Sequence, residues 1–241
     1  MQNIFITATD TGVGKTLVST LLALGFRDKG ISCDHFKPVQ TGIKKTEKGQ
    51  LSTDLMFSAT FLSQGQDISD YCNERNVYTF SHPVSPHLAA KRERKFIDTS
   101  KIISRINEYK KPLIIEGAGG IAVPLSPEYY IFDLINDINL PVIVVSRSKL
   151  GTLNHTFLTV NFLKRMGINV AGIVVSGVSK EPSYIEKDNL TMITEMNRIP
   201  LLGAIPEIEL DVDAGKAPSV PEMRNLARKH FEWNRILETF E

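Results

Sequence analysis

Short apolar runs recur along the chain at the spacing of buried strands, and polar or mixed stretches separate them. The runs predict strands at residues 3–8, 32–37, 112–116, 141–146, 169–176 and 200–205. Most intervening stretches have helical length or carry apolar residues at helical period. They predict helices at residues 15–29, 53–63, 98–109, 152–166, 184–197 and 221–240.

This alternation predicts an α/β fold. Strand–helix–strand units connect with right-handed crossovers, which gives a mostly parallel sheet flanked by helices on both faces. Ligands of such sheets bind at the carboxyl ends of the strands. The 241 residues suffice for one large domain or two small ones, and we expect a single domain over residues 1–241.

Two local features refine this picture. The segment 44–50 is polar and contains glycine, which predicts a mobile surface loop. Pro221 suits the first turn of the last helix, whose apolar side chains predict packing against the core.

The charge balance excludes some classes of partner. Basic and acidic residues number 28 and 27, so the formal net charge is only +1, and we expect neither nucleic acid nor a membrane surface as a partner. Cys33 and Cys72 are too few for a disulfide framework and lack metal-type spacing. With no signal peptide or bilayer-spanning stretch in view, we expect a cytoplasmic protein with small-molecule substrates.

The strongest motif follows the first predicted strand. Residues 8–16 read Ala-Thr-Asp-Thr-Gly-Val-Gly-Lys-Thr, and an apolar helical stretch begins at once. Backbone N–H groups of such a P-loop bind phosphate, Lys15 reaches the β- and γ-phosphates, and the Thr16 hydroxyl can ligate Mg²⁺. The loop is a variant, because Thr9 stands where the usual pattern has glycine. A nucleoside triphosphate is the predicted ligand; the alternative is a turn merely shaped by two glycines.

Three charged residues extend this hypothesis. Lys37 ends the second predicted strand and could neutralise charge during phosphoryl transfer, although it could equally end an ordinary strand. Asp54 opens a predicted helix, where an acidic residue is favoured without any ligand. Glu116 follows an apolar strand and precedes a glycine-rich turn, a position that suits Mg²⁺ because the ion prefers carboxylate and phosphate oxygens.

A second anion site is indicated at residues 149–155, Lys-Leu-Gly-Thr-Leu-Asn-His, which follow a predicted strand and begin a helix. Free N–H groups there could bind a substrate carboxylate, or the residues could simply cap the helix. His87 and His155 have no visible partner in the sequence, and neither is assigned a catalytic role.

Taken together, these segments resemble dethiobiotin synthetases, the ATP-dependent enzymes that close the ureido ring in biotin synthesis. The likeness spans most of the chain and rests on the order and spacing of its motifs. The motifs that carry it are Thr9-Asp10-Thr11 before GVGKT, Lys37-Pro38-Val39 with Thr41-Gly42, Asp54, Ser85-Pro86-His87, EGAGG with Pro124-Leu125, Lys149-Leu150-Gly151 with Asn154-His155, and Pro200-Leu201-Leu202-Gly203 before Ile205-Pro206.

The resemblance implies a P-loop NTPase-like fold and a specific ligase reaction. In that reaction 7,8-diaminononanoate (7,8-diaminopelargonate) and CO₂ form a carbamate, whose oxygen takes the γ-phosphoryl group of ATP. The second amine then attacks the carbamoyl phosphate and expels phosphate. The roles implied are catalysis by Lys15 and Lys37, Mg²⁺ binding by Thr16, Asp54 and Glu116, and contact of Thr11, Lys37 and Thr41 with the reacting amine or carbamate.

The resemblance also implies a set of nucleotide contacts, which are Thr11, Gly12, Val13, Gly14, Lys15, Thr16, Leu17, Glu116, Gly117, Ala118, Gly119, Ser176, Gly177, Ile205, Pro206 and Glu207. It further implies a homodimer that holds the substrate's carboxylate tail near the subunit interface. The tail contacts would be Gly151, Thr152 and Asn154, with Tyr184 of the partner. Helix N-terminal amides can hold a carboxylate whatever the side chain at Thr152.

Two positions depart from the family pattern. Ala8 replaces a usual glycine and adds only a methyl group. Ser176-Gly177 stands where the family carries Asn-Asp to read the base, and a serine forms fewer hydrogen bonds than an asparagine amide. Selectivity for adenine over other bases therefore stays open. The alternative base or ribose contacts are Ile205, Pro206 and Glu207 with the acidic loop through Asp211 and Asp213.

Two other protein classes share this P-loop architecture. Nucleotide-switched partitioning or assembly ATPases carry a second lysine in the loop, but the corresponding residue here is Asp10. An amide-forming ligase of cobalamin synthesis usually adds a glutaminase domain, for which we expect no room in 241 residues.

Overall fold

The computed structural model describes residues 1–47, 49–208 and 218–240. Within these ranges the strands are β1 (Ile4–Ala8), β2 (Asp34–Thr41), β3 (Lys44–Thr46), β4 (Gly49–Leu51), β5 (Asn76–Phe80), β6 (Leu113–Glu116), β7 (Pro124–Ser126), β8 (Tyr129–Tyr130), β9 (Val142–Arg147), β10 (Val170–Val178) and β11 (Leu201–Pro206). The helices are α1 (Lys15–Asp28), α2 (Thr53–Leu62), α3 (Ile68–Glu74), α4 (Pro86–Arg92), α5 (Thr99–Glu108), α6 (Ile131–Ile138), α7 (Thr152–Arg165), α8 (Tyr184–Asn197), α9 (Val220–His230) and α10 (Trp233–Phe240).

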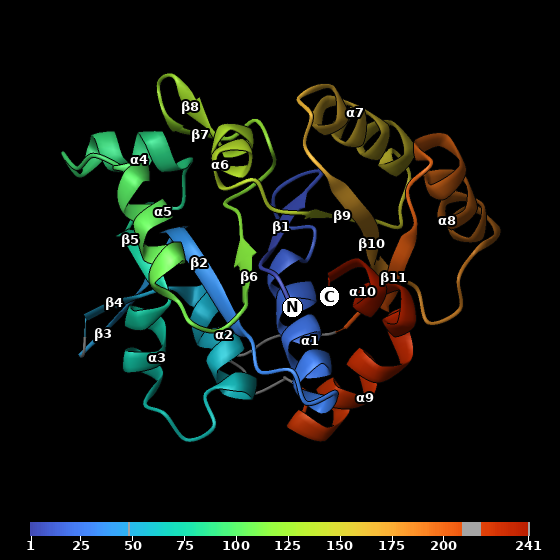
Figure 1. Ribbon diagram of the computed structural model, residues 1–241, viewed down its shortest axis with the longest axis horizontal. Helices are drawn as coiled ribbons and strands as arrows, with labels where there is room; N and C mark the ends of the chain where they lie inside the picture. Colours follow the sequence, from blue (N-terminus) through green and yellow to red (C-terminus); the bar gives the residue numbers. More distant parts are fainter. Residues whose placement is uncertain (48, 209–217, 241) are drawn as a thin grey trace.

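Seven of the described strands form one sheet in the order β11-β10-β9-β1-β6-β2-β5. Every neighbouring pair in it is parallel, and helices cover both faces (Figure 1). The predicted α/β fold is therefore confirmed. All six predicted strands are present with ends shifted by a few residues, whereas β5 at the sheet edge and helices α3, α4 and α6 were not predicted.

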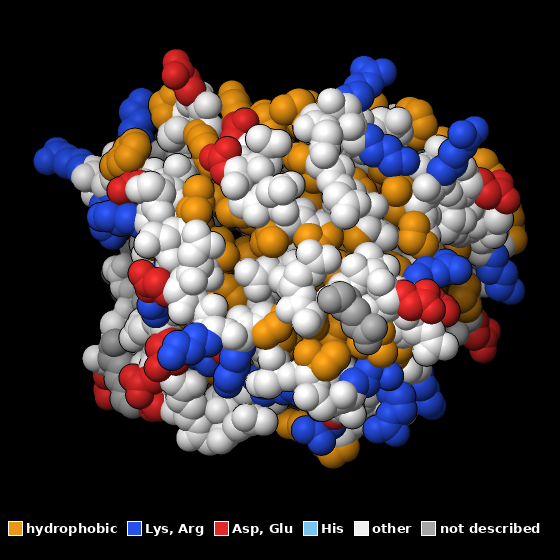
Figure 2. Space-filling model, viewed as in Figure 1, with side chains coloured by type: hydrophobic (Ala, Val, Ile, Leu, Met, Phe, Trp, Pro, Cys, Tyr) orange, Lys and Arg blue, Asp and Glu red, His pale blue; other side chains and the backbone are white. Residues whose placement is uncertain are grey.

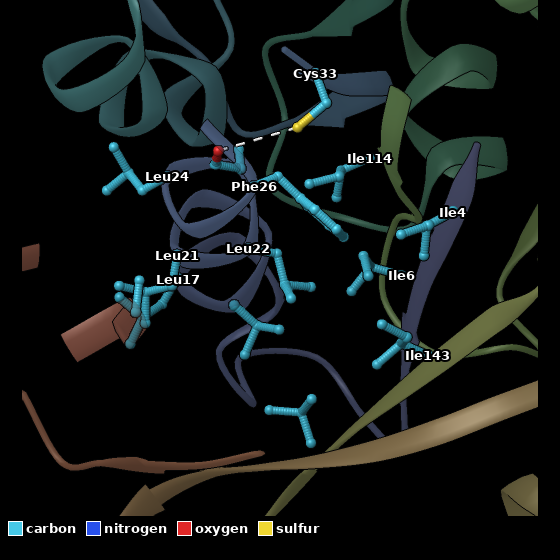
Figure 3. Packing of buried hydrophobic residues seen from close by; sticks show 14 of the residues in the cluster. Ile4, Ile6, Leu17, Leu21, Leu22, Leu24, Phe26, Cys33, Ile114 and Ile143 are labelled. Carbon is cyan, nitrogen blue, oxygen red and sulfur yellow. Dashed lines mark hydrogen bonds between the residues drawn. The ribbon is translucent and has the colours of Figure 1, made fainter. Parts of the chain in front are cut away.

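The core consists of two apolar layers, one on each face of the sheet. On one face α1 packs against the central strands, and Figure 3 shows its Leu22 and Phe26 beside Ile6 and Ile114. These side chains are fully buried. Strands that are covered on both faces are rich in apolar residues, which explains the continuous apolar runs of β1, β6 and β9.

The last predicted helix, 221–240, is broken in two. Phe231 is extended, with φ −121° and ψ 145°, and bridges to Gly203 on the edge strand β11. The chain then turns into α10, whose Trp233 packs on α1 so closely that a Cβ at Gly25 would lie 1.9 Å from the indole ring. Pairing of Phe231 with the sheet edge thus interrupts the helix that the periodicity predicts. Pro221 lies in the first turn of α9, as predicted.

The segment 44–50, predicted as a mobile loop, contributes instead to a hairpin. Strands β3 and β4 pair antiparallel, with Lys44 opposite Leu51. Leu51 is buried in the α1 layer of the core and anchors the hairpin there. One apolar residue at the end of a polar stretch was too weak a signal to predict this pairing.

The surface mixes charges of both signs. Figure 2 shows Lys and Arg side chains interspersed with Asp and Glu across the viewed face. Among the described helices, none combines the length and the apolar character that crossing a bilayer requires.

Candidate active site

The P-loop joins β1 to α1 in the predicted strand–loop–helix arrangement. Gly14 caps α1 in a left-handed conformation with φ +103°, and a Cβ there would lie 2.5 Å from Ser176 Oγ. Both facts require glycine, since other residues rarely adopt this conformation. Asp10 Oδ1 accepts a hydrogen bond from the Thr11 N–H at 2.7 Å and so stabilises the turn from the outside.

A cleft of about 480 Å³ opens at the carboxyl ends of β1, β6 and β2. β6 lies between β1 and β2, and Ile6 is in register with Glu116. Residues far apart in sequence are thereby brought to one edge of the sheet. The cleft is lined by Thr11, Gly12, Gly14, Lys15, Thr16, Leu17, Lys37, Val39, Gln40, Thr41, Asp54, Phe57, Glu116, Ala118 and Gly119.

Lys37 is the paired cation of this cleft. Its Nζ lies 2.7 Å from both Asp54 Oδ2 and Glu116 Oε1, and it also donates to the Gly117 carbonyl at 3.2 Å. Burial alone would lower the pKa of this ammonium, but Asp54 and Glu116 outweigh burial and raise the pKa above its ordinary value. Lys37 therefore stays charged.

Lys15 is the unpaired cation. It is only 6% exposed, and its Nζ donates at 3.4 Å to the Asp10 carbonyl. In the part of the chain that the structure describes, no carboxylate lies within ion-pair distance of it. Burial, reinforced by the positive charge of Lys37, lowers the pKa of Lys15 to about 8. A buried ammonium that forms no ion pair with the described residues, beside the N-terminus of a helix, makes a binding site for an anion.

Glu116 and Asp54 supply the acidic side of the cleft. Glu116 Oε1 accepts from Thr16 Oγ1 at 3.0 Å as well as from Lys37. Burial would raise the pKa of Glu116, but Lys37 and a hydrogen bond from His35 hold it well below its ordinary value. The described residues contain no cluster of three or more His, Cys, Asp or Glu suited to a metal. Two carboxylates and a hydroxyl nevertheless fit Mg²⁺, which completes its shell with phosphate oxygens and water.

A second cleft of about 240 Å³ continues from the first at the ends of β9, β10 and β11. Both clefts share Gly12, Gly14 and Leu17 of the P-loop region. The predicted contacts Val13, Ser176, Gly177, Pro206 and Glu207 line the second cleft. Ile205 lines neither cleft, because its side chain is fully buried in the core, and Asp211 and Asp213 lie outside the described residues.

Two polar residues of the second cleft were not predicted. Arg147 Nη2 donates to the Thr11 and Gly12 carbonyls at 3.3 Å, and Ser148 Oγ donates to the Gly177 carbonyl at 2.7 Å. Their position directly after a buried strand, at the ligand-binding edge of the sheet, was the available signal.

Comparison with known proteins identifies the family. A family model described as an AAA domain matches residues 2–213. The chain is 39% identical over 214 residues to the ATP-dependent dethiobiotin synthetase BioD of Bacillus velezensis, covering 87% of this chain and 88% of the relative. The enzyme of the same name from Bacillus licheniformis is 36% identical over 244 residues, covering 100% and 98%. This chain belongs to the dethiobiotin synthetase family.

Solved structures agree with the fold. The MinC:MinD cell division protein complex of Aquifex aeolicus contains a chain that superimposes with a TM-score of 0.56 at 14% identity, covering 95% of both chains. The cell division ATPase MinD of Pyrococcus furiosus gives 0.53 at 15% identity, covering 99% of both. At such identity the likeness concerns the fold alone, so a P-loop ATPase architecture underlies this member of the dethiobiotin synthetase family.

The tail contacts expected of a dethiobiotin synthetase lie apart from both clefts within one chain. Gly151, Asn154 and Tyr184 are exposed, and Tyr184 is 82% exposed. Thr152 instead points inward, where its hydroxyl donates to the Arg147 carbonyl at 2.6 Å. The side chain of Thr152 therefore stabilises the fold. His87 and His155 line neither of the two clefts.

Proposed function

We propose that this protein closes the ureido ring of dethiobiotin from 7,8-diaminononanoate, CO₂ and ATP, as an ATP-dependent cyclo-ligase of biotin synthesis. A carbamate of one amine takes the γ-phosphoryl group, and the second amine attacks the resulting carbamoyl phosphate. ADP and phosphate are released. The sequence relatives named as ATP-dependent dethiobiotin synthetases support the reaction class.

The main support for the proposal is that two lysines with different surroundings line one cleft. Lys15 lines the cleft without an ion-pair partner among the described residues, and as the P-loop lysine it would contact the β- and γ-phosphates. Lys37 is held by two carboxylates and lines the same cleft. A phosphoryl group between them would be flanked by cations, which is the main requirement of phosphoryl transfer.

Mg²⁺ is part of the proposal, with Thr16, Asp54 and Glu116 as its protein ligands. When bound, the ion would neutralise phosphate charge and orient the triphosphate. Glu116 stays ionised because its pKa is depressed, so it can act as a ligand at neutral pH. Lys37 contacts both carboxylates at 2.7 Å in the structure, and its ammonium would share them with the ion.

The diamine is proposed to bind beside the phosphates. Thr11, Lys37 and Thr41 all line the first cleft and offer polar groups to the reacting amine or carbamate. The P-loop and the turn at Gly117, Ala118 and Gly119 would surround the triphosphate. The second cleft would hold the nucleoside between Ser176-Gly177 and Pro206-Glu207. ATP is the expected nucleotide, and nucleoside triphosphates with other bases are to be tested beside it.

A homodimer is proposed to complete the tail site. Helix α7 and its C-cap residue Met166 expose several large apolar side chains: Leu158 is 59% exposed, Met166 42%, Phe157 39% and Phe162 37%. Such a patch on a described surface supports an interface. We expect Leu158→Glu to yield monomers in light scattering, whereas Phe96→Glu, at an exposed position elsewhere, leaves the mass unchanged. A monomeric unsubstituted protein would contradict the proposal.

The domain organisation and the cellular location also belong to this proposal. We place residues 1–241 in one domain, supported by a single parallel sheet that spans the described chain. We place the protein in the cytoplasm, supported by Cys33 and Cys72, which are both buried and unpaired.

The test mixes purified protein with 7,8-diaminononanoate, bicarbonate, Mg²⁺ and each nucleoside triphosphate separately. Phosphate release and the mass of the organic product are followed together. Diamine-dependent phosphate release with dethiobiotin as the product supports the proposal, and the ranking of nucleotides measures base selectivity. Nucleotide hydrolysis that ignores the diamine and gives no organic product would instead favour a nucleotide switch.

A further inference from the structure

A buried histidine adjoins the proposed metal site without lining the cleft. His35 lies on β2, two residues before Lys37, and is 0% exposed. Its Nε2 lies 2.9 Å from Glu116 Oε2, and its Nδ1 lies 2.6 Å from Ser58 Oγ. Both ring nitrogens are thus committed to partners on different elements, β6 and α2.

Polar contacts within hydrogen-bond distance continue beyond Ser58 to both remaining members of the proposed metal site. Ser58 Oγ contacts the Asp54 carbonyl at 3.1 Å and Thr20 Oγ1 at 2.9 Å. Thr20 Oγ1 in turn donates to the Thr16 carbonyl at 2.8 Å. One buried chain of three side chains, His35, Ser58 and Thr20, therefore connects the Glu116 carboxylate with the backbone of Asp54 and Thr16.

The chemistry of the carboxylate defines what His35 does to Glu116. An ionised carboxylate only accepts hydrogen bonds, so Nε2 carries the proton and donates to Oε2. The other oxygen, Oε1, accepts from Thr16 at 3.0 Å and from Lys37 at 2.7 Å, on the cleft side. His35 thus binds Oε2 and leaves Oε1 for groups in the cleft. This hydrogen bond fixes the rotation of the Glu116 carboxylate.

A purely structural role accounts for part of this arrangement. Serine and threonine in helices often donate to the carbonyl four residues earlier, as Thr20 does here, and Ser58 Oγ also lies 3.1 Å from the Asp54 carbonyl. That preference does not account for a histidine with no exposed surface whose two ring nitrogens both have polar partners. An apolar side chain could fill the same space without needing two partners.

We propose that His35 is a positioning residue that, through Ser58 and Thr20, locks Glu116, Asp54 and Thr16 in the arrangement that binds Mg²⁺ together with the nucleotide. The inference rests on the proposed metal site. Outer hydrogen-bond partners of metal ligands are typically worth about 10–100-fold in metal affinity or activity. His35 would act on the affinity of the metal and not on the phosphate contacts of Lys15.

The test measures Mn²⁺ binding by electron paramagnetic resonance, with a non-hydrolysable ATP analogue present. His35→Leu removes both hydrogen bonds, whereas His35→Gln keeps a donor in reach of Glu116. We expect His35→Leu to weaken Mn²⁺ binding by about tenfold or more, His35→Gln to recover most of the affinity, and binding of the analogue without metal to stay unchanged. His230→Leu is the matched control, because His230 bonds to the Ala204 carbonyl at the far edge of the sheet.

Mn²⁺ affinity of His35→Leu within twofold of the parent protein would overturn the inference, even if its stability fell. If His35→Leu does not fold, Ser58→Ala cuts the same chain one link further on and decides the matter: a several-fold loss of Mn²⁺ affinity supports the inference, and an unchanged affinity overturns it. A parent protein that binds no Mn²⁺ with the analogue would instead overturn the proposed metal site itself.

Discussion

Replacing Lys15 by methionine removes one buried charge at similar volume, and the structure predicts a more stable protein. Burial and Lys37 lower the pKa of Lys15 from 10.5 to about 8. At about 1.4 kcal/mol for each tenfold change in proton affinity, that difference corresponds to about 3 kcal/mol against the charged folded state. We expect Lys15→Met to raise the free energy of unfolding of the nucleotide-free protein by about 2–3 kcal/mol at pH 7 and to abolish nucleotide binding.

The same substitution at Lys37 is the matched control, and its predicted effect has the opposite sign. Lys37 bonds to Asp54 and Glu116, so its loss leaves two carboxylates without their cation. Removing one partner of a buried ion pair typically costs about 3–5 kcal/mol. We therefore expect Lys37→Met to destabilise the protein by an amount in that range.

The assay is urea unfolding of both variants and the parent protein, without nucleotide or Mg²⁺, at pH 7 and pH 10. Between pH 8 and the ordinary pKa of 10.5, unfolded Lys15 keeps a proton that the folded protein has lost. The free energy of unfolding of the parent protein therefore rises with pH over this interval. The difference in this free energy between Lys15→Met and the parent should shrink accordingly. If Lys15→Met were less stable than the parent at pH 7, or if its gain in stability were equal at both pH values, the charge of Lys15 would not destabilise the folded protein.

Two further predictions concern the ligands. Glu116→Gln should lower phosphate release at limiting Mg²⁺ and regain part of it at raised Mg²⁺; unchanged activity at limiting Mg²⁺ would remove Glu116 from the ligand set. Nucleotide affinity of the parent protein, measured by calorimetric titration, should fall as pH rises through about 8, because the ammonium of Lys15 is then lost. An affinity independent of pH from 7 to 9 would mean that Lys15 is not the phosphate-binding cation.

The parts of the fold and site that the sequence predicts are those encoded locally. The P-loop and the apolar strand before Glu116 carry their signal within about ten residues, and parallel topology then brings them to one edge. β5 was missed because it is an edge strand whose residues are mostly half-buried, which weakens the apolar pattern. The break at Phe231 depends on pairing with β11, a contact that helical periodicity cannot contain.

His35 and Thr152 show the same limit at the level of side chains. His35 shares the strand face of Lys37 by the alternation of β2, so its direction was readable, but its partners Glu116 and Ser58 come from other elements. Thr152 stands in a motif that indicates ligand binding, yet its hydroxyl turns inward to the Arg147 carbonyl. Whether a polar side chain faces ligand or fold depends on neighbours that only the three-dimensional structure supplies.

The central claim is that ATP cleavage in the Lys15–Lys37 cleft drives formation of a ureido ring. The most direct measurement supplies ¹³C-labelled bicarbonate with ATP, Mg²⁺ and 7,8-diaminononanoate, then compares labelled dethiobiotin by mass spectrometry with phosphate released. We expect one labelled carbon in the product and one phosphate released for each product molecule. Phosphate release without labelled dethiobiotin would contradict it.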